Sequence, residues 1–175
     1  MENYKKNLEL LTKNHVYSEE MEHDACGVGL IASTEGKKSR AVVEYGIEAL
    51  KAVWHRGAVD ADGKTGDGAG IHVEIPKDFF IEKIQVTGHD YDNSEICVGM
   101  IFLPRNDYSA QENCKTIVES ELTKNNFSIY GWRQVPVNPK VLGEKALQTM
   151  PEIIQVLFKS NDPNLLDKNL ERKIY

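Results

Sequence analysis

Cysteine is scarce in this sequence, with three residues in 175. Cys26, Cys97 and Cys114 are odd in number and widely spaced, which suits neither a disulfide framework nor the close spacing of zinc or iron–sulfur ligands. We therefore expect a reducing compartment, the cytoplasm, and no metal or other cofactor held by this chain itself.

The sequence also lacks a long apolar run and an excess of positive charge. Its longest apolar stretch is far shorter than the roughly 18 residues that a membrane span needs, and residues 1–16 lack the apolar core of a secretory signal. The formal net charge is −6, and no cluster of Lys and Arg lies beside aromatic residues. This pattern argues against nucleic-acid and membrane partners.

The composition that remains is that of a globular domain, with 41% hydrophobic and 27% charged residues in a length that suits one core. Strand and helix patterns follow one another without a regular β-α-β rhythm, so we expect the α+β class. Expected strands cover residues 26–33, 71–76, 96–103, 127–137 and 151–159. Expected helices cover residues 40–54, 77–84, 109–124 and 142–149, with a last one after 160–163.

Three finer predictions concern the packing of a strand, the packing of a helix and the end of another helix. The run at 96–103 is apolar on both faces, which indicates a strand covered on both sides and a buried Cys97. Cys114 lies on the apolar face of the expected helix 109–124 together with Ile117. Gly57 is expected to cap the helix 40–54, with Arg56 complementing the negative end of its dipole.

Cys26 stands where a polar leader, residues 1–25, gives way to the apolar segment 26–33. Gly27 and Gly29 leave one face of that segment without side chains, so a ligand can approach the sulfur closely. We predict a leader or propeptide over 1–25 and a domain over 26–175.

Residues 57–70 form a loop with five glycines, too many for the interior of a helix or a strand. The loop nearly matches a phosphate-binding loop, a dinucleotide fingerprint and a calcium loop, but each match fails on spacing or on a ligand position. None of these three ligands is therefore predicted.

The stretch HDACGVGLIA at 23–32, followed by WHRGAVDADGKTGDGAGI at 54–71, resembles the opening of the large subunit of glutamate synthases. In that family the amino-terminal domain is a class II glutamine amidotransferase of the N-terminal-nucleophile hydrolase type. The resemblance implies an αββα four-layer sandwich, incomplete in this chain, and Cys26 as the catalytic nucleophile. It also implies a set of residues that organise the site: His55, Arg56, Gly57, Asp67 and Gly68.

The chemistry that this resemblance implies needs a free α-amino group on Cys26. Hydrolysis of an amide by a thiol needs a proton acceptor, and the sequence offers no obvious Cys–His pair. Cleavage between Ala25 and Cys26 would create an amine with a pKa of about 7.7–8.0 beside a thiol near about 8.5. One residue would then supply both nucleophile and base, and glutamine would yield a thioester, ammonia and finally glutamate.

In the complete enzyme, the resemblance implies a second site where this ammonia and 2-oxoglutarate give glutamate, with FMN and an iron–sulfur cluster. The expected partners are glutamine, 2-oxoglutarate, the remaining synthase domains and a small electron-donating subunit. NADPH, NADH and ferredoxin stay open as electron donors. The Asn-Gly pair of the family's oxyanion hole has no counterpart at Asn125-Asn126 or Asn138-Pro139. We therefore expect an amino-terminal fragment that is inactive alone.

Two other functions remain open at this point. The chain could be a stand-alone amidohydrolase of the same nucleophile class, which requires a full site within the 150 residues after processing. It could also be a non-catalytic interaction domain, which would keep residues 1–25 and lack a reactive thiol.

Overall fold

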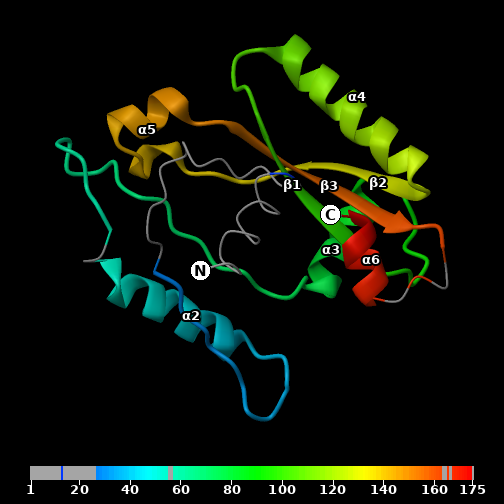
Figure 1. Cartoon of the computed structure of the whole chain (residues 1–175), viewed down its shortest axis with the longest axis horizontal. Helices are drawn as coiled ribbons and strands as arrows, with labels where there is room; N and C mark the ends of the chain where they lie inside the picture. Colours follow the sequence, from blue (N-terminus) through cyan, green and yellow to red (C-terminus); the bar gives the residue numbers. More distant parts are fainter. Residues whose placement is uncertain (1–12, 14–26, 55–56, 163–164, 166, 175) are drawn as a thin grey trace. The chain divides into compact units, whose positions relative to one another are not determined.

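The computed structural model describes residues 13, 27–54, 57–162, 165 and 167–174. The chain divides into two compact units, Met1–Arg56 and Gly57–Tyr175, and each is described by itself. The first unit contains helix α2, Arg40–Ala52 (Figure 1). Its N-cap is Ser39, whose hydroxyl accepts a hydrogen bond from the backbone N–H of Ala41 at 3.2 Å.

Two predictions for the first unit are wrong. Helix α2 ends at Ala52 with Val53 as its C-cap, so Gly57 does not cap it. The described part of the expected strand 26–33 has no strand pairing, and Val28 and Leu30 are 92% and 89% exposed. A strand needs a neighbour for its backbone groups, and the described residues of this unit hold no other strand to provide one.

The second unit is built on a three-stranded antiparallel sheet. Its strands are β1 (Cys97–Leu103), β2 (Phe127–Gln134) and β3 (Glu152–Ser160), in the order β1-β3-β2 (Figure 1). β3 is the central strand, with Cys97 opposite Phe158 on one side and Phe127 opposite Ser160 on the other. The register between β2 and β3 shifts between Ile129 and Gly131, which marks an irregularity of the bulge type.

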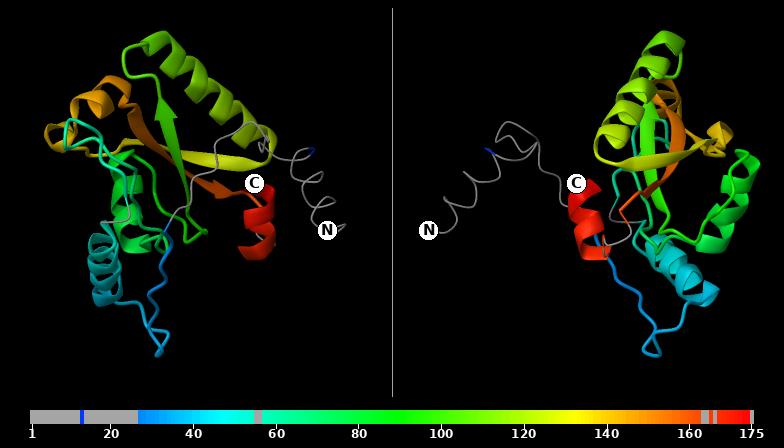
Figure 2. Two further views of the ribbon diagram at one scale, coloured as in Figure 1. Left: turned by 60° about the vertical axis from the view of Figure 1, so that its left-hand side comes forward. Right: turned by 90° about the vertical axis from the view of Figure 1, so that its right-hand side faces the viewer.

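Helices of the second unit lie on both faces of this sheet, as the right-hand view of Figure 2 shows for α3 and α4. The α-helices are α3 (Lys77–Val86), α4 (Tyr108–Lys124), α5 (Glu144–Thr149) and α6 (Asp167–Ile174), and a short 3-10 helix, η2, covers Pro139–Val141.

Apolar side chains fill two cores, one on each face of the sheet. On one face, Phe80 and Ile84 of α3 pack with Leu157 of β3. On the other face, Phe158 of β3 packs in a cluster that includes Leu170 of α6. The predicted burial of Cys97 is confirmed, because its side chain lies in this second core at 5% exposure.

The apolar run at 96–103 forms β1, but it lies at an edge of the sheet and is not fully covered. Met100 and Phe102 are 47% and 63% exposed, so the prediction of cover on both faces is wrong. On α4 the expected apolar face is also only partly buried, since Ile117 is 62% exposed and Cys114 is half-buried. The expected strand 71–76 is extended chain without strand pairing.

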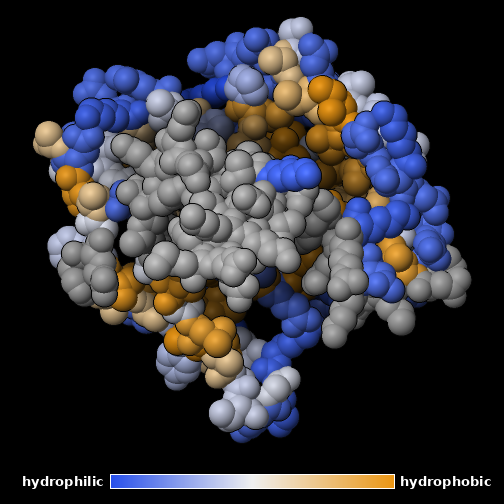
Figure 3. Space-filling model, viewed as in Figure 1, coloured by the Kyte–Doolittle hydropathy of each residue, from blue (hydrophilic) through white to orange (hydrophobic). Residues whose placement is uncertain are grey.

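The mixture of helices and an antiparallel sheet confirms the α+β class, whereas the four-layer αββα arrangement stays a prediction. Hydrophilic residues line the outer side of α4, with apolar residues exposed beside them (Figure 3). Across the residues that the structure describes, no helix is both long and apolar enough to cross a membrane.

Candidate functional site

The predicted site residues fall into two groups. Cys26, His55 and Arg56 lie outside the residues that the structure describes. Gly57, Asp67 and Gly68 lie in the second unit, at the two ends of a hairpin formed by residues 58–67, which we call the site hairpin.

Backbone contacts turn the glycine-rich loop into this hairpin. Val59 and Gly66 form an antiparallel bridge, and the backbone N–H of Asp60 donates to the carbonyl of Thr65 at 2.6 Å. The N–H of Gly63 donates to the carbonyl of Asp60 at 2.9 Å, which closes the turn. Gly63 has a φ of 67°, the left-handed conformation that glycine adopts without steric cost.

Asp67 closes the base of the site hairpin. Its Oδ2 accepts a hydrogen bond from the N–H of Ala58 at 2.9 Å, and its own N–H donates to the carbonyl of Ala58 at 3.1 Å. Asp67 thereby fixes the backbone of Ala58, the residue directly after Gly57. Among the described residues, a Cβ placed on Gly68 would meet no heavy atom within 4 Å, so no side chain or backbone covers this position there.

Asp62 anchors the turn of the site hairpin. Its Oδ1 accepts from the N–H groups of Lys64 at 2.9 Å and Thr65 at 2.7 Å, while Oδ2 accepts from the hydroxyl of Thr65 at 2.6 Å. The hydroxyl of Thr65, followed by these backbone N–H groups, lowers the pKa of Asp62 to about 2. The carboxylate is therefore ionised at neutral pH and serves as an acceptor, not as a catalytic proton carrier.

The start of helix α5 contacts the same turn. The N–H of Glu144 donates to Oδ2 of Asp62 at 3.1 Å, and Nζ of Lys145 donates to Oδ2 of Asp60 at 2.6 Å. Sequence reasoning missed these contacts. The spacing of Asp62 and Thr65 is a recognisable signal for a side-chain-closed turn, but no pattern in the sequence points from that turn to α5.

The acidic residues of the site hairpin do not build an ion site. Within the described ranges, no group of three His, Cys, Asp or Glu side chains is placed to hold a metal ion. The carboxylates of Asp62 and Asp67 instead accept hydrogen bonds from backbone N–H groups of their own hairpin. The site hairpin can hold its backbone in place next to a reacting group. It contains no cysteine, so a nucleophile has to come from another part of the chain.

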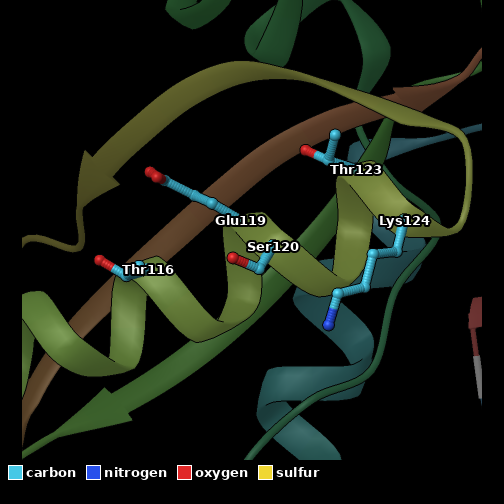
Figure 4. A pocket seen from close by; sticks show the side chains of 5 residues that line it. All are labelled: Thr116, Glu119, Ser120, Thr123 and Lys124. Atoms are coloured by element: carbon cyan, nitrogen blue, oxygen red, sulfur yellow. The ribbon is translucent and has the colours of Figure 1, made fainter.

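A shallow pocket lies apart from these residues, along helix α4 (Figure 4). Among the described residues, those that line it all belong to α4: Thr116, Glu119, Ser120, Thr123 and Lys124. Its carboxylate is already engaged, because Nε1 of Trp132 in β2 donates to Oε1 of Glu119 at 2.6 Å. Gly57, Asp67 and Gly68, the predicted site residues that the structure describes, do not line this pocket.

The two described cysteines differ from the expected nucleophile. Burial raises the pKa of the Cys97 thiol to about 11, and the charge of Glu95 adds to that shift. A thiol with so high a pKa stays protonated at neutral pH and is a poor nucleophile. Cys114 is half-buried on α4, so its expected place in the core is only partly confirmed.

Comparison with known proteins places residues 26–175 within the family model described as glutamine amidotransferases class-II. The chain is 53% identical over 172 residues to the large chain of the NADPH glutamate synthase of Azospirillum brasilense, an alignment that covers 98% of this chain. It is 39% identical over 155 residues, or 88% of the chain, to ferredoxin-dependent glutamate synthase 1 of Arabidopsis thaliana. It is 35% identical over 173 residues, or 93% of the chain, to the NADH glutamate synthase of Saccharomyces cerevisiae.

The resemblance to glutamate synthases that was predicted from the two motifs is confirmed by these matches. The chain spans about a tenth of the length of these relatives, namely 11%, 9% and 8% of the three sequences.

Proposed function

Because the chain belongs to the class II glutamine amidotransferases, we propose that it carries part of the glutamine-hydrolysing site of a glutamate synthase. In this proposal residues 26–175 belong to the amidotransferase domain, and residues 1–25 are a leader that is removed. The observation that carries the proposal is the start of the family match at Cys26, where the sequence motif predicts the nucleophile.

Cys26 is the proposed catalytic residue. Its thiolate attacks the side-chain amide carbon of glutamine, and its own freed α-amino group accepts the thiol proton and passes it to the leaving nitrogen. Ammonia leaves, a thioester remains on Cys26, and water then releases glutamate. The amine can accept a proton only after the bond between Ala25 and Cys26 has been cut, so processing is a requirement for activity.

The residues around Cys26 have positioning roles in this proposal. Arg56, together with His55 and Gly57, organises the site next to the nucleophile. Asp67 supports the same stretch, because its hydrogen bonds to Ala58 fix the backbone directly after Gly57. Gly68 leaves its backbone accessible to the substrate.

The proposed fate of the ammonia is the reductive amination of 2-oxoglutarate in other domains of the complete enzyme. FMN and an iron–sulfur cluster supply the electron transfer there, with electrons from a small subunit or another donor. The described residues of this chain do not fit the cluster, because neither Cys97 nor Cys114 belongs to a group of three side chains placed to hold a metal. No step proposed for this chain goes through either group.

The four-layer αββα sandwich is proposed for the complete domain. Met100 and Phe102 support it, because these exposed side chains of β1 share the sheet face on which Val98 packs with the α3 core. In the four-layer arrangement, a second sheet would pack on this face next to α3 and cover Met100 and Phe102. A structure of the complete domain in which both side chains remain exposed would contradict this arrangement.

We also propose a cytoplasmic location, which the scarcity of cysteine supports.

The test compares two reactions of the complete enzyme that contains this segment. Replacing the nucleophile, Cys26→Ala, should reduce glutamine-dependent glutamate synthesis at least about 10³-fold, while synthesis from added ammonia continues at the second site. The matched control is Cys114→Ala, which removes a half-buried thiol of α4 and should leave both reactions unchanged. Intact mass of the active protein should show a chain that begins at Cys26. An active enzyme that retains Met1 would contradict the mechanism.

A further inference from the structure

The site hairpin is held from outside itself by the first residues of α5. Asp62 and Asp60 accept hydrogen bonds from Glu144 and Lys145, residues that lie more than 80 positions later in the chain. The Lys145 ammonium and the Asp60 carboxylate form an ion pair, whereas the Glu144 contact is made by a backbone N–H. These contacts join the part of the chain that follows Gly57 to a helix that the sequence motifs do not include.

The contact also completes the end of helix α5. The first N–H groups of a helix have no partner within the helix, and a side chain of the residue before it usually accepts from one of them. In α5 that preceding residue is Gly143, which has no side chain and makes no such bond. Oδ2 of Asp62 accepts from the N–H of Glu144 instead. Asp62 therefore closes its own turn and caps α5 at the same time.

Gly143 lets the two segments come this close. Its φ of −72° and ψ of 165° are open to any residue, so the backbone conformation does not require glycine. A Cβ at this position would lie 2.1 Å from Oγ1 of Thr65, 2.4 Å from Oδ2 of Asp62 and 2.5 Å from the backbone nitrogen of Thr65. All three distances fall below the 3.0 Å that Cβ atoms keep, so with a methyl group here the site hairpin and the start of α5 must move apart.

We infer that Gly143, Glu144 and Lys145 are positioning residues of the glutamine site, which they serve by fixing the site hairpin through Asp62 and Asp60. This inference rests on the function proposed above. The path is short: the turn held by α5 is joined through the bridge of Val59 and Gly66 to the base closed by Asp67, next to Gly57. A small displacement of a positioned group can reduce turnover about 10²-fold, so a shift of this hairpin should reach the substrate.

The first experiment replaces Gly143 in the complete enzyme and follows the two nitrogen sources separately. Gly143→Ala should reduce kcat/KM for glutamine roughly tenfold to a hundredfold and leave ammonia-dependent glutamate synthesis unchanged. The matched control is Gly46→Ala in α2, where the added methyl group meets no atom of the described residues within 4 Å and both reactions should stay as in the wild type. An unchanged glutamine reaction in Gly143→Ala would overturn the inference.

A second pair of variants keeps the test valid if the alanine disturbs folding more widely. Lys145→Met removes the ion pair with Asp60, while Lys145→Arg retains a donor and a charge. We expect a two- to fivefold rise in the KM for glutamine with Lys145→Met and recovery with Lys145→Arg. Hydrogen exchange at the Asp60 amide, which donates to Thr65, should speed up in Lys145→Met and in Gly143→Ala. Equal KM values in the two Lys145 variants would contradict a positioning role.

The outcome also separates this inference from the function on which it rests. If Cys26→Ala leaves glutamine-dependent synthesis intact, the proposed function fails, whatever the α5 variants do. If Cys26→Ala abolishes that reaction and Gly143→Ala does not change it, the function stands and the positioning role of α5 fails.

Discussion

The sheet and the site hairpin are held in opposite ways. The sheet is fixed by apolar side chains, with Leu157 at the centre fully buried between its neighbours. The site hairpin is exposed and is fixed by carboxylates that accept hydrogen bonds, both from its own backbone and from α5. Burial of apolar side chains contributes much of the stability and does not depend on their orientation. Hydrogen bonds to a carboxylate contribute less stability in water, but they require a defined distance and angle. The sheet is therefore stabilised by apolar burial, whereas the site hairpin is positioned by hydrogen bonds.

The largest effect is expected where the sheet is weakened. Leu157→Ala removes a side chain with no exposed surface from the central strand, and the free energy of unfolding should fall by about 3 kcal/mol because a cavity remains. Chemical denaturation measures this change. Val141→Ala, at a side chain that is 67% exposed, is the control and should change stability by less than about 0.5 kcal/mol. Similar losses of unfolding free energy in both variants would contradict the conclusion that buried apolar side chains of the sheet hold the fold together.

Acid should weaken the contacts that hold the turn of the site hairpin. The folded pKa of Asp62 is about 2, below its ordinary value of 3.8, so its contribution to stability is present above pH 3.8 and is lost as the pH falls through about 2. A carboxyl titration followed by NMR should give a midpoint near 2, and Asp62→Asn should abolish this transition. A midpoint close to 4 would show that the contacts from Thr65, Lys64 and Glu144 are not made in solution.

The smallest effect is expected for polar contacts that lie within one helix. Lys124 and Glu121 form an exposed ion pair near the end of α4, with a distance of 2.6 Å between Nζ and Oε1. Lys124→Ala should change the free energy of unfolding by less than about 0.5 kcal/mol, because water screens such pairs. Thermal unfolding at low and high salt checks this. A larger loss would mean that exposed ion pairs in general, and not only those that join distant segments, support this protein.

The scaffold was more accessible to sequence reasoning than the site was. The apolar runs at 96–103, 127–137 and 151–159 correspond to β1, β2 and β3, because burial leaves a periodic signal in the sequence. The same reasoning failed at 26–33 and 71–76, where the residues have a strand-like pattern but no strand of the described chain pairs with them. An apolar pattern indicates which residues favour burial, but it does not identify the strand with which they pair.

The candidate site was predicted by motif and not by packing. The motif at 54–71 indicated that Gly57 and Asp67 belong to one site, and the structure places them at the base of one hairpin. The contact of that hairpin with Gly143 could not be predicted. Exposed hydrogen bonds between residues some 80 positions apart have no periodicity, and a glycine that serves close approach looks in sequence like any loop glycine.

The central place of β3 sets the order of events during synthesis of the chain. β1 and β2 leave the ribosome first, yet each of them pairs with β3 and not with the other. At translation rates of about 5 to 20 residues per second, β1 waits for roughly 2 to 10 s until its partner has been made. Until β3 has been made, β1 and later β2 lack the neighbour that each has in the folded sheet, so we expect a nascent chain that stops before Glu152 to be the form that aggregates most readily.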